Sequence, residues 1–293
     1  MRIIRLLISN ILYIIWFLLY FTMAWAWLYL SLTPQESFLI VAIIYAVSIT
    51  IALSPLGEIL LRFIDGCREP ATEQERNYLL PLFEEVYEDA KQLNPKLNNG
   101  IKIYIMDAMY VNAFAMGRQT VAVTKGAMET FTADELKGIL AHELGHISYG
   151  HTKARLLTVI GNFFFTVMIL LFKIVLVPMQ FISNIMARFS VIGIGFAVIA
   201  FIAQFIVNLA IFLFVHVSHI ILALNSRANE IQADTFAYDI GYGRELTSSM
   251  YLLQKISMDV NIRFWDKIKA THPHIAKRIA NLERLENEGY GLE

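Results

Sequence analysis

The chain has 293 residues, of which 57% are hydrophobic and 17% are charged, and its mean hydropathy is +0.54. This composition is too apolar for an ordinary soluble enzyme, whereas the charges in its middle exclude a protein that lies wholly in a membrane. The net charge of −1 provides no basic surface for nucleic acid, and the single cysteine, Cys67, excludes an internal disulfide or a cysteine-based metal cluster.

Four apolar runs are long enough to cross a bilayer, which needs about 20 residues. In chain order they are residues 6–30, 38–56, 156–177 and 191–222. Lys173 in the third run can extend its side chain to the nearer interface, and the fourth run is long enough to tilt or to project from the membrane. Arg2 and Arg5 would also suit a signal peptide, but the length of the first run favours an uncleaved anchor.

The basic residues predict an orientation for this four-span arrangement. The loops on one side carry most of them, namely Arg2, Arg5, Arg62, Arg68, Lys153, Arg155 and Arg227. The opposite loops carry Arg188 and, near an interface, Lys173. By the positive-inside rule, both termini and the polar segments are expected on the cytoplasmic side of the inner or plasma membrane. In this arrangement residues 1–57 form a transmembrane hairpin, 58–155 a polar part, 156–222 a second transmembrane pair and 223–293 a C-terminal polar part.

The polar segment before the third span has the pattern of a folded α+β unit. Two capping boxes, Thr72 with Glu75 and Thr132 with Glu135, predict helices that run to about residue 93 and through residue 142 toward residue 150. Between them lie three strand-like runs, 101–106, 111–116 and 120–124, with a turn at 117–119. We predict a small antiparallel sheet here and several helices after residue 227.

The stretch AHELGHISYGH, residues 141–151, carries the chemistry. On a helix, His142 and His146 leave the same face one turn apart and can bind one zinc ion. Glu143 lies about 100° around the helix, where it can reach a water at the metal and act as general base and then general acid. Two surface histidines are the alternative interpretation, but the capped helix favours a metal site.

The residues alone leave the third ligand open. Glu230 and Asp234 share a helix face, so one can bind the ion while the other orients a histidine, although a solvated acidic pair has the same spacing. His151 is one position away from the metzincin pattern and is read as a surface or supporting residue. His219 lies eleven residues before Glu230, about 16 Å along a continuous helix, and His216 lies farther still, so both are assigned to helix packing or to a separate role.

The chain resembles the HtpX-type membrane zinc metalloproteases, whose family also contains the CAAX prenyl proteases and the OMA-type proteases. The resemblance is carried by VNAFA at 111–115, AHELGH at 141–146, SRANEIQAD at 226–234 and THP at 271–273. It implies a mainly α membrane protein with a zincin-like catalytic domain of the gluzincin type. It also implies one zinc ion on His142, His146 and Glu230, with Glu143 as general base and Asp234 as a supporting residue.

The resemblance further implies that Asn112, Ala113 and Phe114 belong to an edge strand that binds substrate by backbone pairing. His272 is either a donor to the oxyanion or a structural residue. The expected function is cleavage of misfolded or damaged membrane proteins, or other unfolded polypeptides, in membrane quality control under stress.

Three other functions share part of this pattern. A CAAX-type prenyl endopeptidase would use the same chemistry but usually has more than four spans. A site-2-type intramembrane protease would carry its motif inside an apolar span, whereas the polar TADELKG precedes the motif here. A zinc-binding scaffold or chaperone would not need Glu143 as a base.

Overall fold

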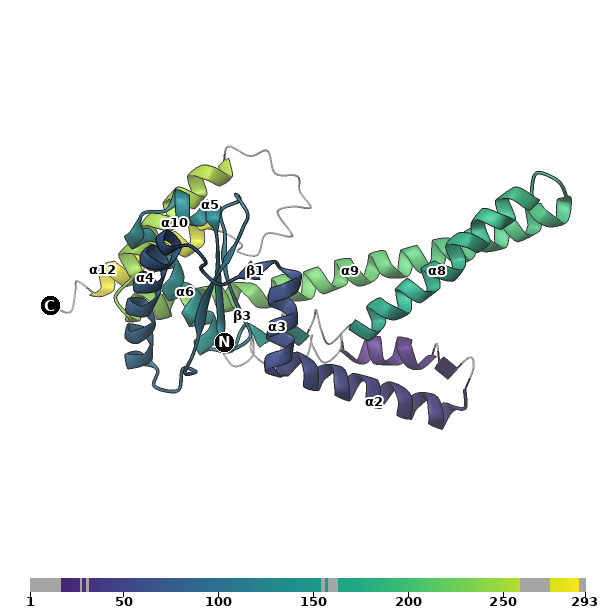
Figure 1. Cartoon of the computed structure of the whole chain (residues 1–293), viewed down its shortest axis with the longest axis horizontal. Helices are drawn as coiled ribbons and strands as arrows, with labels where there is room; N and C mark the ends of the chain where they lie inside the picture. Colours follow the sequence, from purple (N-terminus) through teal and green to yellow (C-terminus); the bar gives the residue numbers. More distant parts are fainter. Residues whose placement is uncertain are drawn as a thin grey trace. The chain divides into compact units, whose positions relative to one another are not determined.

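A computed structural model shows a mostly helical protein with one four-stranded sheet (Figure 1). It describes residues 17–26, 28–29, 32–153, 156–157, 163–258 and 275–289, without the side chains of 163–166, 168–169, 172, 210, 213–228, 257–258 and 289. The chain forms two compact units. The apolar unit comprises Met1–Ser48 and Gly161–Leu224, and the sheet unit comprises Ile49–Ile160 and Asn225–Glu293.

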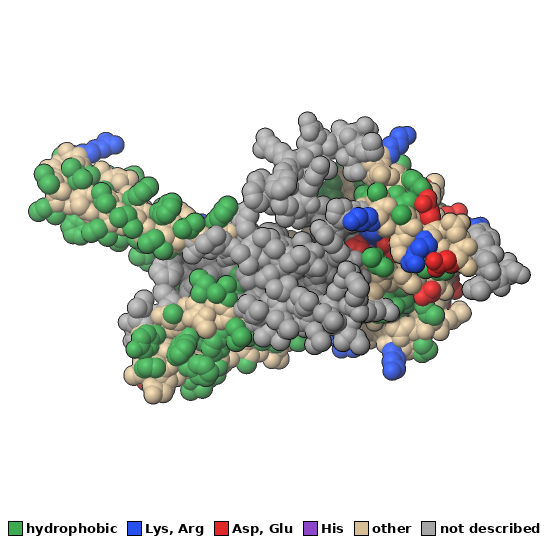
Figure 2. Space-filling model, turned by 180° about the vertical axis from the view of Figure 1, so that it is seen from behind, with side chains coloured by type: hydrophobic (Ala, Val, Ile, Leu, Met, Phe, Trp, Pro, Cys, Tyr) green, Lys and Arg blue, Asp and Glu red, His purple; other side chains and the backbone are tan. Residues whose placement is uncertain are grey.

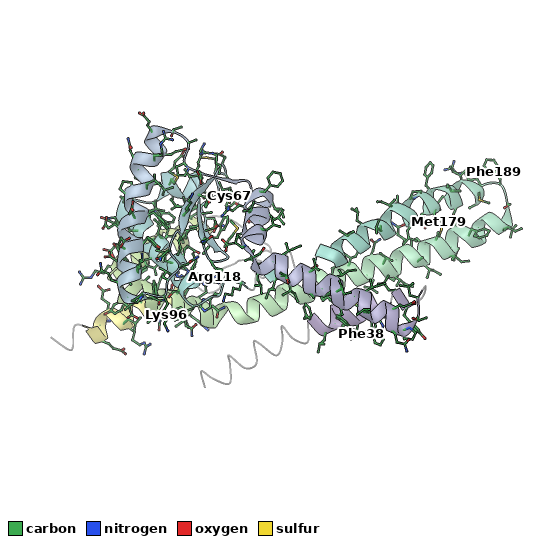
Figure 3. All side chains as sticks on the ribbon, turned by 60° about the horizontal axis from the view of Figure 1, so that its bottom comes forward. Phe38, Cys67, Lys96, Arg118, Met179 and Phe189 are labelled. Carbon is green, nitrogen blue, oxygen red and sulfur yellow. The ribbon has the colours of Figure 1, made fainter. Side chains whose placement is uncertain are left out.

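Long apolar helices make up the apolar unit. They are α2 (Pro34–Leu53), α8 (Phe163–Met186) and α9 (Val191–Asp239), of which α2 and α9 continue into the sheet unit. Their surfaces are mainly hydrophobic, whereas charged side chains gather on the sheet unit (Figure 2). Large side chains on these helices, such as Phe38 and Met179, and Phe189 in the turn after α8, point away from the ribbon (Figure 3).

Two of the four predicted spans contain helices long and apolar enough to cross a membrane, Pro34–Leu53 and Val191–Leu209. In the part of the chain that the structure describes, the first predicted span contains a shorter apolar helix, Phe17–Ala26, and another, Lys173–Met186, begins near the end of the third span and extends beyond it. The presence of membrane-length helices is therefore confirmed. The count of four spans and the cytoplasmic orientation stay predictions.

The sheet unit contains the remaining elements. They are α3 (Pro55–Ile64), β1 (Cys67–Arg68), α4 (Glu73–Leu93), β2 (Lys102–Met106), β3 (Ala113–Met116), β4 (Thr120–Thr124), α5 (Lys125–Thr130), α6 (Ala133–Ser148), α10 (Gly243–Met258) and α12 (Ile275–Gly289). Both predicted capping boxes are confirmed. The hydroxyls of Thr72 and Thr132 accept from the amides of Glu75 and Glu135, whose carboxylates accept from the threonine amides.

The prediction of an antiparallel sheet is wrong, because the sheet is mixed. Its strand order is β1-β2-β4-β3, with β2 and β4 parallel and the other pairs antiparallel. All five residues of β4 are buried, so this strand takes a central position with a partner on each side. Strand β4 therefore lies between β2 and β3, parallel to β2 and antiparallel to β3, and β3 is left at the edge of the sheet.

Alternate residues of the strands face two different layers. Ile103, Ile105, Val121 and Val123 belong to the main core, which α4, α6, α10 and α12 complete. Tyr104, Met116 and Ala122 face the other way and pack with Ala52 of α2 and Leu61 of α3. In Figure 1, α3 and the pair α4 and α6 accordingly lie on opposite sides of the sheet.

Candidate active site

The proposed catalytic residues lie on α6, in the middle of the sheet unit. Thr132 caps this helix, and ten of its sixteen residues are buried, including His142 and Glu143. Most of the buried positions are apolar and pack into the main core, so the helix is fixed in place before any ligand binds. The imidazoles of His142 and His146 meet edge to face, with ring centroids 4.7 Å apart.

The end of α9 brings Glu230 to the two histidines. Gly145 permits this approach, because a Cβ atom there would lie 3.0 Å from the Cα of Ala233 and 3.2 Å from the Cβ of Phe236. Glu230 is one helical turn before Ala233, and its carboxylate is buried. Its Oε2 lies 3.4 Å from Nε2 of His142, and its Oε1 lies 3.5 Å from Nε2 of His146.

The geometry of these three side chains fits zinc. The two Nε2 atoms are 3.1 Å apart, and one ligand atom from each residue lies within 4.8 Å of the others. Four ligands at about 2.0–2.1 Å in a tetrahedron are separated by about 3.3 Å, which is close to all three distances. Two imidazoles and one carboxylate are also the donor set of catalytic zinc sites that leave a position open.

Asp234 and Arg278 support the His142 side of the cluster. The Nδ1 atom of His142 lies 2.9 Å from Oδ1 of Asp234, which fixes the tautomer that leaves Nε2 facing Glu230. Arg278 of α12 donates to both oxygens of Asp234, from Nε at 2.8 Å and from Nη2 at 2.6 Å. Its Nη1 lies 2.8 Å from Oε2 of Glu230, and all of these groups are buried.

His151 and Gln232 provide a comparable arrangement for His146. The Nδ1 atoms of His146 and His151 are 3.1 Å apart, and Nε2 of His151 lies 3.1 Å from Oε1 of Gln232. Since the amide oxygen can only accept, Nε2 of His151 donates to it and Nδ1 of His151 accepts from His146. The Nε2 atom of His146 is then left without a proton and can bind a metal.

Charge in the site favours a divalent cation. Among the described residues of the cluster, the carboxyl groups of Glu143, Glu230 and Asp234 outnumber the one guanidinium, that of Arg278. Burial and the Arg278 charge lower the pKa of His142, but its bonds to Asp234 and Glu230 outweigh both and raise it to about 9. Burial, with a contribution from His146, lowers the pKa of His151 to about 4, so this ring is neutral at pH 7.

The edge strand β3 lies beside α6. The Asn112 carbonyl accepts from the Thr124 amide at 3.0 Å, which places residue 112 opposite residue 124 and sets the register of the hairpin. Phe114 is half-buried, and Ala113 is buried. The predicted substrate-binding segment therefore lies next to the helix that carries Glu143.

Sequence reasoning placed most of this cluster but missed two contributors. Arg278 was missed because it lies 44 residues beyond Asp234. The sequence does place this charged residue inside the apolar stripe of Ile275, Ile279 and Leu282, which indicates that it is buried. Gln232 was overlooked inside a motif already assigned to the metal. His272 lies outside the described residues. The side chains of His216 and His219 on α9 do too.

Comparison with known proteins agrees with the motif-based resemblance. The family model described as "Peptidase family M48" matches residues 73–286. A protease HtpX homolog from Dictyoglomus turgidum is 36% identical over 47% of this chain and 43% of its own length. Another HtpX homolog, from Methylacidiphilum infernorum, is 28% identical over 74% of this chain and 75% of its own length.

Among solved structures, S. mikatae Ste24p is similar, with a TM-score of 0.42 and 18% identity. That match covers 84% of this chain and 56% of Ste24p. The M48 model extends from the start of α4 almost to the end of α12, so it includes β3, the α6 motif, and the α9 and α12 residues around it. The chain therefore belongs to peptidase family M48 and resembles the HtpX-type members of this family.

Proposed function

We propose that this protein is a zinc-dependent endopeptidase that hydrolyses peptide bonds of misfolded or damaged membrane proteins at the cytoplasmic side of the membrane. The observation that carries the proposal is the joint placement of His142, His146 and Glu230 beside Glu143 and the edge strand β3. The tetrahedral spacing of the three ligand atoms supports zinc, and the adjacent edge strand supports an extended polypeptide substrate.

In the proposed mechanism, His142, His146 and Glu230 hold the ion. Bound there, zinc supplies Lewis-acid activation of water and of the scissile carbonyl. Glu143 takes a proton from the attacking water and passes it to the nitrogen of the scissile bond. The protonated nitrogen then takes the electron pair of the C–N bond and leaves as a neutral amine. Asp234 and His151 hold the two imidazoles in the tautomers that keep both Nε2 atoms available.

A substrate segment would pair with β3 through main-chain hydrogen bonds. Such pairing is independent of side-chain identity, so it suits a protease that acts on many damaged proteins. The long apolar helices would hold this site close to the membrane, where such substrates are exposed. Recognition of a prenylated C-terminus would need a lipid-binding groove, and no observation in the described residues favours this alternative.

The test compares the parent protein with Glu143→Gln and with Asp134→Asn, after metal removal and zinc addition in detergent. Asp134 is exposed on the same helix, so its variant controls for a lost carboxylate. We expect zinc to restore cleavage of an unfolded fluorescent polypeptide in the parent and in Asp134→Asn. Glu143→Gln should bind zinc normally and remain at least about a hundredfold slower, since general acid–base catalysis contributes about 10²–10⁴-fold. Equal activity of parent and Glu143→Gln would refute the proposal.

A further inference from the structure

Helix α3 exposes an apolar surface. Five of its ten residues are large, hydrophobic and exposed, at the helical spacing i, i+3, i+4, i+7 and i+8, and we name them the α3 apolar face: Leu56, Ile59, Leu60, Phe63 and Ile64. Phe63 is 84% exposed, which is high for a phenylalanine beside a packed core. The opposite side of the helix, with Gly57, Glu58 and Leu61, is buried. In a water-soluble unit the large apolar residues of such a helix would be buried, and charged residues such as Glu58 would be exposed.

The position of α3 in the chain indicates what covers this face. Only Ser54 separates α3 from Leu53, the last residue of the candidate span α2. The corner is tight, because a Cβ atom on Gly57 would lie 2.4 Å from the Ala52 carbonyl oxygen. If α2 crosses the bilayer, α3 must begin at the level where the hydrocarbon meets the headgroups.

Contacts on the inner side of α3 prevent the helix from entering the hydrocarbon. Glu58 is a buried carboxylate that accepts from the amides of Arg118 at 2.5 Å and Gln119 at 3.1 Å, in the turn between β3 and β4. Arg62 donates to the hydroxyl of Thr120 at 2.8 Å. Because these charged groups bind the sheet, α3 is held between the sheet on one side and whatever covers its apolar face on the other.

From these observations we infer that the α3 apolar face lies on the membrane, in the plane of the interface, as an amphipathic second anchor beside the spanning helix. Three features support this placement: α3 follows α2 directly, every exposed position from Leu56 to Ile64 is apolar, and Glu58 and Arg62 bind the sheet on the inner side. The helix is about 15 Å long, which suits a short interfacial segment.

The inference deepens the proposed function, on which its enzymatic consequence rests. The β3–β4 turn is bound to Glu58, so the end of the substrate-binding strand at Met116 would be kept near the bilayer surface. The α6 helix lies against the other face of the sheet. A polypeptide leaving the membrane could then add to β3 without first diffusing into the cytoplasm.

Depth-dependent quenching tests the inference without any need for proteolysis. Cys67 is replaced by alanine, and a single bimane-labelled cysteine is introduced at Phe63, at Ile43 in the middle of α2, or at the exposed Lys96 of the sheet unit. The full-length protein is reconstituted in phosphatidylcholine vesicles with nitroxides on the headgroup, on acyl carbon 5 or on acyl carbon 12. Zinc binding by each labelled protein checks that it is folded.

We expect the headgroup and carbon-5 nitroxides to quench position 63 at least twofold more strongly than position 96. The carbon-12 nitroxide should quench position 43 most. If position 63 behaves like position 96, the face is in water or covered by protein; if it behaves like position 43, α3 is inserted in the hydrocarbon. Either result overturns the inference.

One double variant, Phe63→Gln with Ile64→Gln, tests the enzymatic consequence. It should leave zinc-dependent cleavage of a soluble unfolded peptide in detergent unchanged. The same variant should slow cleavage of a membrane-tethered substrate in vesicles about three- to tenfold. Absence of cleavage by the parent would count against the proposed function alone, whereas equal rates in vesicles for parent and variant would count against a role of α3 in substrate delivery.

Discussion

The Nη1 atom of Arg278 lies 2.8 Å from Oε2 of Glu230, and the other end of the same guanidinium binds Asp234. A cation on α12 thus bridges two carboxylates on successive turns of α9. One of these carboxylates is proposed to hold zinc, and the other orients His142. The guanidinium and the metal therefore share the task of neutralising the same buried negative charges.

This sharing predicts that Arg278→Met destabilises the metal-free protein much more than the zinc-loaded protein. Removing one partner of a buried ion pair costs about 3–5 kcal/mol, because the remaining charge stays buried without compensation. Bound zinc would offset most of that loss. Thermal unfolding of both forms in detergent measures the difference, with Arg284→Gln, an exposed position on the same helix, as control. An equal shift of both midpoints would show that Arg278 acts only by packing.

His151 gives a second prediction. Its ring accepts from His146 and donates to Gln232, so His151→Ala should weaken zinc binding about tenfold, within the 10–100-fold range for such supporting residues. His151→Gln should recover part of the affinity, because an amide oxygen can still accept from His146. Competition with a chromogenic chelator measures both constants. Parent-like affinity in His151→Ala would assign the residue to the surface role that the sequence left open.

Most of the local structure of the site follows from sequence. The Thr132 capping box defined the start of α6, the strand pattern defined β4 residue for residue, and the i, i+4 spacing put His142 and His146 on one face. These features depend on contacts within a few residues. The strand order depends on which strand is buried on both faces. All five residues of β4 are buried, and the prediction of an antiparallel sheet did not include this central position.

Arg278 shows the limit of local reasoning. Its partners Glu230 and Asp234 lie more than 40 residues away in the sequence, across a segment whose length fixes no geometry. A position inside the apolar stripe of an amphipathic helix should have been recognised as buried, and a buried guanidinium requires an anionic partner. The pattern could therefore predict that Arg278 is paired, but only the tertiary structure, which brings Arg278 of α12 to Glu230 and Asp234 of α9, identifies the partners.

A third prediction concerns acid stability in the sheet unit. The guanidinium of Arg68 and the backbone amides of Ala71 and Thr72 lower the pKa of Glu75 from 4.5 to about 2. Because the folded-state pKa is the lower one, the stabilisation is complete above about pH 4.5 and is lost as the pH falls toward 2. Glu75→Gln keeps a side chain suited to the capping box but removes the charge.

Thermal unfolding of parent and Glu75→Gln from pH 7 to pH 2 measures this contribution. The parent should melt at the higher temperature at pH 7, and the gap between the two midpoints should close between pH 4.5 and pH 2. The pair lies at the surface and is partly exposed to solvent, so the gap should be small. A gap that stays constant over this range would mean that Glu75 acts through its hydrogen bonds and not through its charge.

The register of the hairpin yields a prediction about substrate binding. The Thr124 amide donates to the Asn112 carbonyl, so alternation along this antiparallel pair turns the amide of Phe114 toward β4. The amides of Ala113 and Ala115 then point away from β4, toward the edge where a substrate strand would pair. Ala115→Pro removes one of these donors, and an edge position tolerates proline better than a central one.

We expect Ala115→Pro to lower kcat/KM for unfolded polypeptides about tenfold, with zinc affinity unchanged, because a lost main-chain hydrogen bond and the altered strand both weaken pairing. Ala115→Ser retains the amide at nearly the same side-chain volume and should cleave like the parent. If serine and proline have equal effects, the side chain and not the amide is responsible. If proline leaves kcat/KM unchanged while zinc binding is intact, substrate does not pair with β3, and the proposed route from the membrane along this strand must be abandoned even if the metal site is correct.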